Sequence, residues 1–170
     1  MAQTKQQKIA VVQKLEEAFA NATSTVFVHF KGVKIDEETQ MRRELKAANV
    51  KYTVAKKTLI KRALESLGHK IDDMPMEGEL AVAYGGGDDA TAPARLMHEY
   101  GKKFLGANKE NKISILGGLF EKALVGKESM LEIATVPPMD TLRGMFANII
   151  NSPRQRFAVV LSKVAETKNA

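Results

Sequence analysis

The chain has 170 residues, of which 44% are hydrophobic and 27% charged, so its composition is globular and its length suffices for one core plus an extension. Its formal net charge is +6, and the absence of cysteine excludes disulfides and thiolate metal sites and is typical of a reducing compartment. No apolar run approaches the roughly 18 residues of a membrane span, and the charged start of the chain is unlike a signal peptide, so we expect a cytoplasmic protein without membrane contact.

The first part of the chain predicts two helices around a buried strand. Apolar residues recur at helical spacing over 4–20. The segment TVFVHF, over 25–30, is β-branched and aromatic with apolar side chains on both faces, which is typical of a buried strand. A second helix is expected to begin at an Asp36 cap and to run to about Ala48, where Asn49 can end it.

The rest of the chain up to a proline pair continues this alternation. The further elements expected are, in chain order, a strand over 50–55, a helix over 58–68, a loop over 70–78, a strand over 79–84, a turn over 85–89, a helix over 89–105, a strand over 112–120 and a short helix over 127–136. Asp88 or Asp89 is expected to cap the helix after the GGGDD turn. Pro137 and Pro138 then interrupt the chain, because neither can continue a helix.

This order of elements predicts the fold class. A helix, a strand–helix–strand unit, a second helix and a second strand–helix–strand unit within 136 residues favour a ferredoxin-like α+β sandwich. A doubly wound parallel sheet is the alternative. We expect a domain over 1–136, followed by a C-terminal helical segment over 137–170 that lies outside the sandwich.

Basic residues are concentrated in the first part of the chain. Residues 1–69 carry 13 Lys and Arg against 7 Asp and Glu, a net charge equal to that of the whole chain, whereas residues 70–136 carry 8 against 11. The candidates for binding a polyanion are Lys51, Lys56, Lys57, Lys61 and Arg62 in KYTVAKKTLIKRAL, with Arg42 and Arg43 on the preceding helix and Lys31 in the loop before it. The alternative is a solvated basic face with no ligand.

Two lysines in this set oppose the helix dipole. Lys56 and Lys57 stand at the N-terminus of the expected 58–68 helix, where cations cost about 0.3–1 kcal/mol each, and an anion docked there would use both the lysines and the free N–H groups. Only Tyr52 offers an aromatic ring nearby, so we expect recognition of a nucleic-acid backbone and its shape rather than base stacking.

Nothing in the sequence predicts catalysis, a metal site, a cofactor or a small-molecule substrate. His29, His69 and His98 lie in three unrelated contexts. The GGGDD turn lacks the Lys-Ser/Thr pair that a phosphate-binding loop requires. We therefore expect a protein that is not an enzyme.

The C-terminal segment carries a continuous apolar stripe at helical spacing. Its large apolar residues are Leu142, Met145, Phe146, Ile149 and Ile150 before Pro153, and Phe157, Val160, Leu161 and Val164 after it. Pro153 is expected either to kink one helix or, with Ser152 as a cap, to divide it into two segments of about eleven residues each. The stripe could pack on the domain's own sheet, form a helical hairpin, or bind a partner.

Four motifs and this tail resemble the stalk-base protein of the bacterial large ribosomal subunit, the L-ten family. The motifs are FKGVKIDEETQMRREL, with Gly32 and Arg42 in family positions, VAKKTLIKRAL, ILGGLFE and LEIATVPPMDTL. The resemblance covers nearly the whole chain. Three positions depart from the family pattern: Lys57 replaces Asn, the segment 78–80 replaces Gly-Pro-Thr, and Pro138 replaces Ser.

The resemblance implies a structural role on the ribosome. The domain over 1–136 would bind large-subunit rRNA beside the L-eleven protein, with Gly32 joining the basic residues at the interface. The tail would anchor dimers of the acidic L-seven/L-twelve stalk protein, which recruit translational GTPases. Because the apolar residues form one patch on each side of Pro153, we expect two such dimers per chain. The alternatives are an RNA-binding ribosome-assembly factor and an RNA-binding adaptor that self-associates through its tail.

Overall fold

The computed structural model describes residues 5–68, 78–85, 87, 89–104 and 111–168. It divides into two compact units, Met1–Val136 and Pro137–Ala170. The predicted loop over 70–78 lies, apart from Gly78, outside the described residues, as do Asp88 and the predicted end of a helix at Leu105.

The first unit is built on a five-stranded sheet with the order β2-β3-β1-β4-β5. The strands are β1 (Ser24–Phe30), β2 (Val50–Val54), β3 (Leu80–Gly85), β4 (Ile113–Phe120) and β5 (Ala123–Val125). Every neighbouring pair is antiparallel, with Ser24 opposite Gly85 on one side and opposite Phe120 on the other. The first four strands form two interleaved split β-α-β units, so the predicted ferredoxin-like sandwich is confirmed and the alternative of a parallel sheet is wrong.

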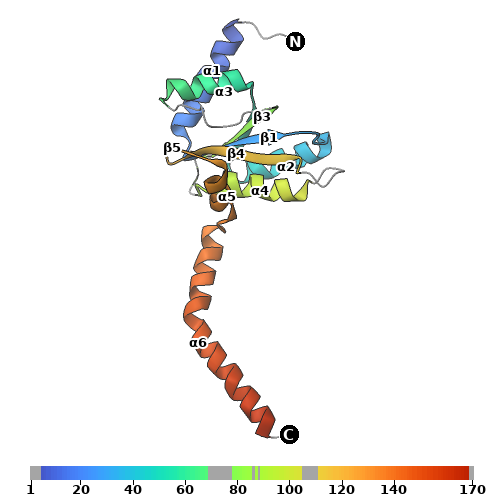
Figure 1. Cartoon of the computed structure of the whole chain (residues 1–170), viewed down its shortest axis with the longest axis vertical. Helices are drawn as coiled ribbons and strands as arrows, with labels where there is room; N and C mark the ends of the chain where they lie inside the picture. Colours follow the sequence, from blue (N-terminus) through green and yellow to red (C-terminus); the bar gives the residue numbers. More distant parts are fainter. Residues whose placement is uncertain (1–4, 69–77, 86, 88, 105–110, 169–170) are drawn as a thin grey trace. The chain divides into compact units, whose positions relative to one another are not determined.

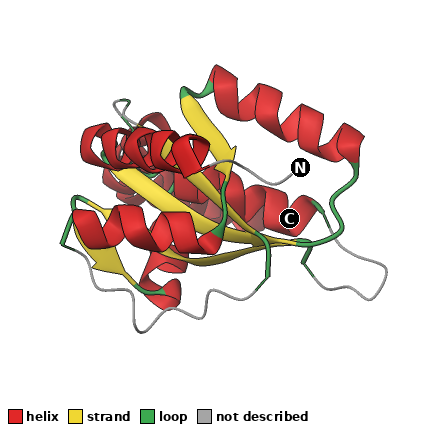
Figure 2. Ribbon diagram, turned by 90° about the horizontal axis from the view of Figure 1, so that it is seen from above, coloured by secondary structure: helices red, strands yellow, loops and turns green. Residues whose placement is uncertain are grey.

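Helices cover both faces of this sheet (Figures 1 and 2). Helices α1 (Lys5–Asn21) and α3 (Lys57–Ser66) pack on one face around Phe27, while α2 (Ile35–Ala47), α4 (Ala92–Lys103) and α5 (Lys127–Thr135) pack on the other around Val26 and Val28. Alternate residues of β1 therefore enter different cores, which explains why its sequence is apolar on both sides.

Two helix starts differ from those predicted. Asp36 lies in the first turn of α2, and Lys34 occupies the cap because the Glu37 carboxylate accepts a hydrogen bond from the Lys34 N–H at 3.0 Å. Helix α4 begins at Ala92, after Thr91, whereas Asp89 lies before the helix and accepts hydrogen bonds from the Thr91 N–H and hydroxyl. Asp89 therefore steadies the turn that leads into α4 without being its cap.

The second unit is a single helix, α6 (Met139–Lys168), with Pro153 inside it. The helix runs through the proline, so the predicted division into two segments is wrong, and Figure 1 shows its axis bending partway along. None of its described side chains is buried. Among the described residues, no helix is both long and apolar enough to cross a membrane.

Candidate nucleic-acid interface and partner-binding helix

Several of the predicted interface residues lie at the two ends of the sheet, where its strands begin and finish. Val50 pairs with Gly85 and Ser24 with Gly85, so β1 and β2 begin at the same end of the sheet and also finish together at the other. Lys56 and Lys57 follow β2, and Lys31 and Gly32 follow β1, so the structure brings these four residues to one end. Lys51 lies near the opposite end, at the start of β2.

The remaining basic residues lie on the helices beside β2. Arg42 and Arg43 belong to α2 and Lys61 and Arg62 to α3, so the two pairs are on helices that cover opposite faces of the sheet. All the predicted basic residues are exposed. Because β2 is an edge strand, the basic surface wraps around that edge instead of forming one flat face.

The end of the sheet beyond β2 contains a groove of about 650 Å³. Its lining includes Phe30 from β1, Lys56, Lys57 and Thr58 from the start of α3, and Gly78 before β3. Lys56 is the cap residue of α3, makes no side-chain capping hydrogen bond, and is followed by no acidic residue in the first turn. The two lysines and the N-terminus of α3 suit an anion such as phosphate, whereas the rest of the groove is lined mainly by apolar side chains and also by Glu79.

An ion pair between the half-buried side chains of Lys112 and Glu37 holds the loop after β1 in place, and no sequence pattern predicted it. The Lys112 ammonium lies 2.9 Å from both oxygens of the Glu37 carboxylate, and the Lys112 carbonyl accepts a hydrogen bond from the Lys31 N–H at 2.9 Å. The hydrogen bond from Lys112, with a second from the Lys34 N–H, holds the pKa of Glu37 below its usual range. Lys112 thereby ties the loop that carries Lys31 and Gly32 to α2.

Arg42 has structural partners within the chain. Its guanidinium lies 2.7 Å from the Glu38 carboxylate, donates to the Tyr52 carbonyl at 3.5 Å, and stands 4.9 Å from the centre of the Tyr52 ring. Burial, and next the Glu38 charge, raise the pKa of Tyr52 to about 12. Tyr52 is therefore covered by Arg42, and its ring is a poor platform for a base.

The apolar side chains of α6 have no cover within their own unit, because that unit is one helix. Leu142 is half-buried, and the other eight predicted partner-binding residues are between 49% and 70% exposed. A helical hairpin is wrong, since α6 is continuous. The sheet of the first unit carries helices on both faces.

The described residues hold no group of three His, Cys, Asp or Glu side chains that could bind a metal ion. The described histidines, His29 and His98, lie on β1 and α4, on different layers of the first unit. There are thus two candidate sites, a basic sheet edge in the first unit that suits an anion and the apolar helix α6 of the second unit that suits a protein partner.

The chain is similar to known ribosomal proteins along nearly its whole length. The family model described as Ribosomal protein L10 matches residues 3–102. The protein named Large ribosomal subunit protein uL10 from Lacticaseibacillus casei is 33% identical over 162 residues, which covers 95% of this chain and 92% of the relative. Proteins of the same name are 32% identical over 168 residues in Shouchella clausii (99% and 97%) and 33% identical over 166 residues in Lactobacillus acidophilus (95% and 94%). The chain therefore belongs to the ribosomal protein L10 family, a family of structural, non-enzymatic proteins of the large ribosomal subunit.

Proposed function

We propose that this protein is an adaptor of the large ribosomal subunit in the cytoplasm, with the unit over 1–136 bound to rRNA and α6 holding the acidic stalk protein. The apolar stripe of α6 carries the proposal. It is a 30-residue helix without a single buried side chain in its described part, which is a costly feature unless a partner covers it.

The rRNA contact is assigned to the end of the sheet beyond β2. Lys56 and Lys57 lie there at the N-terminus of α3, and Lys61 follows one turn after Lys57 on the same helix face. Lys31 follows β1 at the same end of the sheet. Gly32, with φ of 66° and free space around it, lets the backbone itself approach a phosphate. Further positive charge around the edge comes from Arg43, Lys51 and Arg62. Arg42 contributes less, because its ion pair with Glu38 partly neutralises its charge.

The stalk protein is assigned to α6. Burying one large apolar side chain is worth about 1.5–3 kcal/mol, so the patch before Pro153 and the patch after it are each large enough to hold a partner after the cost of association. We assign one dimer of the acidic L-seven/L-twelve protein to each patch. The acidic partner also suits the net positive charge of residues 137–170, which carry 5 Lys and Arg against 2 Asp and Glu. The neighbouring L-eleven protein is expected beside the rRNA-bound unit.

The double substitution Lys56→Ala and Lys57→Ala tests the rRNA contact. Each phosphate contact contributes roughly 0.7–0.9 to the slope of log affinity against log salt, so losing two should weaken binding to the rRNA fragment and flatten the slope by about 1.5. Filter binding or calorimetry over a salt series measures both. The charge-matched control is Lys102→Ala with Lys127→Ala, which changes two exposed lysines of α4 and α5. Equal affinity and slope for the two double variants would remove the α3 N-terminus from the interface.

A further inference from the structure

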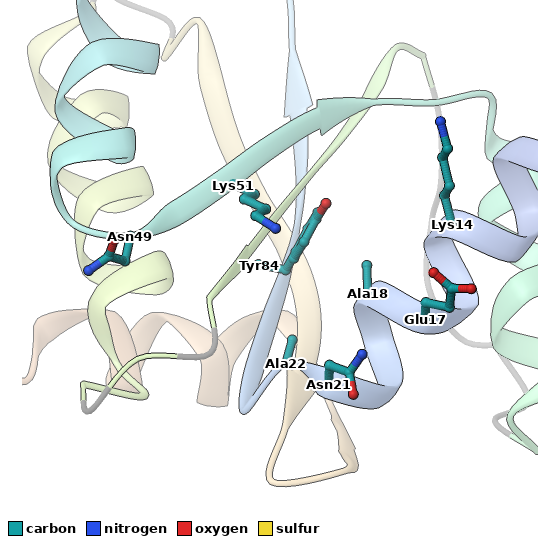
Figure 3. A pocket seen from close by; sticks show the side chains of 8 residues that line it. All are labelled: Lys14, Glu17, Ala18, Asn21, Ala22, Asn49, Lys51 and Tyr84. Atoms are coloured by element: carbon teal, nitrogen blue, oxygen red, sulfur yellow. The ribbon is translucent and has the colours of Figure 1, made fainter.

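A polar hollow lies at the end of the sheet opposite to the start of α3. Its volume is about 380 Å³, and it is lined by Lys14, Glu17, Ala18, Asn21, Ala22, Asn49, Lys51 and Tyr84. Figure 3 shows the Lys51 and Tyr84 side chains side by side on neighbouring strands, with Ala18 and Asn21 on the side of α1 nearest to them. The Lys14 side chain does not point toward Lys51, and Asn49 lies apart at the start of β2. None of the groups assigned to rRNA at the start of α3 belongs to this lining.

Strand register and helix spacing bring these residues together. Lys51 pairs with Tyr84, so both side chains point to the same face of the sheet, the face that α1 covers. On α1, Lys14, Glu17 and Asn21 recur at intervals of three and four residues and so lie along one side of the helix. Because β2 is the edge strand, the hollow is continuous with the basic edge of the sheet.

The lining offers the set of groups that an unpaired nucleotide requires. Within the described part of the chain, neither Lys14 nor Lys51 has an ion-pair partner, so both ammonium groups are available to phosphate. Tyr84 is half-buried and supplies an aromatic side chain, while the amides of Asn21 and Asn49 both donate and accept hydrogen bonds. Glu17, when ionised, only accepts. Proteins that bind unstacked RNA bases combine basic side chains that contact the backbone with an aromatic ring and polar groups that contact the base.

We propose that this hollow binds one unpaired nucleotide of the RNA, an inference that rests on the proposed rRNA binding and adds a second contact, to a base, to it. The phosphates lie against Lys14 and Lys51, and the base enters beside Tyr84. The ionised Glu17 carboxylate accepts a hydrogen bond from an N–H group of the base, and because each of the four bases carries such a donor, the hollow should bind them with similar affinity.

The first test uses short single-stranded RNA on the full chain. Titration with oligo(C), oligo(A) or oligo(U) should shift the NMR signals of the Asn21 and Asn49 side-chain amides, because stacking on an aromatic ring does not select among bases. The variant Tyr84→Leu should lower the affinity about tenfold, in keeping with the loss of one base–aromatic contact, whereas Tyr84→Phe keeps the ring and should keep the affinity. Unshifted Asn21 and Asn49 amides, or full affinity in Tyr84→Leu, would overturn the assignment.

The second test separates this contact from the proposed rRNA site. Lys14→Ala changes one exposed side chain outside the proposed rRNA site and should flatten the salt slope for the rRNA fragment by roughly 0.7–0.9, while Lys102→Ala should leave it unchanged. If Lys14→Ala matches the control while Lys56→Ala with Lys57→Ala weakens binding, the nucleotide site is wrong and the rRNA proposal stands. If the full chain does not bind the fragment at all, the rRNA proposal fails, and the oligonucleotide titration alone decides the hollow.

Discussion

Gly118 on β4 marks the closest approach between two layers of the first unit. A Cβ atom built there would lie 2.2 Å from the Thr25 carbonyl oxygen and 2.6 Å from the Met130 Cε atom of α5. The strand pairing shifts register beside this point, between Phe27 and Val28, and Gly117 has φ of 148°. The two glycines of the ILGGLFE motif thus let β1 and α5 pack directly on β4.

Gly118→Ala is therefore expected to destabilise the protein by about 3 kcal/mol or more, because the backbone of β1 cannot yield to an added methyl group. Chemical denaturation followed by circular dichroism measures the change. Gly126→Ala is the matched control, since nothing lies within 4 Å of its added Cβ, and its effect should stay within about 1 kcal/mol. Similar losses for the two variants would mean that the close approach at Gly118 is not what the packing requires.

The Glu37–Lys112 pair makes stability depend on pH. Since the folded-state pKa of Glu37 lies below its ordinary value of 4.5, its contribution is complete above that value and is lost as the pH falls through the lowered pKa. We expect Glu37→Gln to lower the denaturation midpoint at neutral pH and the difference from the parent to shrink as the pH falls below about 4. The same substitution at exposed Glu132 is the control. A difference that stays constant across this range would contradict the ion-pair account.

Single residues at the interface were predictable to different degrees. The opposition of Lys56 and Lys57 to a helix dipole was visible in the sequence, because helix spacing and the preceding strand fix where the helix starts. The engagement of Arg42 with Tyr52 depends on how β2 lies beside α2, and no local pattern reports that. Lys14 and Tyr84 are 70 positions apart in the chain, and they line one hollow only because α1 packs on the face of the sheet to which Tyr84 points.

At the scale of elements, hydrophobic patterns predicted every helix that the structure describes and four of the five strands of its sheet. The exception is β5, which is three residues long, largely exposed, and joined to β4 by Glu121 and Lys122 with positive φ. So short a strand has no alternation to read, and it forms because the turn returns the chain against β4. The predicted start of α2 was wrong because the Glu37 carboxylate, and not that of Asp36, accepts the hydrogen bond at the beginning of the helix, from the Lys34 N–H.

Helix α6 holds a proline in its interior, which removes one N–H donor and leaves the carbonyl four residues earlier, that of Ile149, without its helical partner. The cost is about 3 kcal/mol, and a proline inside a helix is also a common cause of a bend such as the one in α6 (Figure 1). The sequence left both a kink and a break at Pro153 open, and the structure shows one continuous helix through the proline.

Pro153→Ala is expected to restore this hydrogen bond and to slow amide hydrogen exchange around positions 149–157 by a factor that corresponds to roughly 3 kcal/mol at most. Exchange measured by mass spectrometry on the full chain reports it. Pro138→Ala is the control, because Pro138 precedes the helix and its carbonyl already accepts from the Leu142 N–H at 3.0 Å. Equal exchange in the parent and in Pro153→Ala would show that the proline does not weaken α6.

At the scale of the molecule, the two units differ in how they use apolar surface. The first unit buries its apolar residues in two cores, one on each face of the sheet, and exposes a basic edge. The second unit exposes nearly all of its apolar residues. The sequence predicted this contrast in composition, but the grouping of basic residues at two ends of the sheet follows from the strand order β2-β3-β1-β4, which no charge pattern encodes.

The number of stalk dimers on α6 tests the adaptor account most directly. Native mass spectrometry of the full chain mixed with the acidic stalk protein should find one chain with two dimers, and the chain truncated after Asn151 should carry one, because it keeps only the patch of Leu142, Met145, Phe146, Ile149 and Ile150. A truncated chain that carries none would indicate a single long site across Pro153. A full chain that binds no dimer and instead forms a homodimer through α6 would contradict the account.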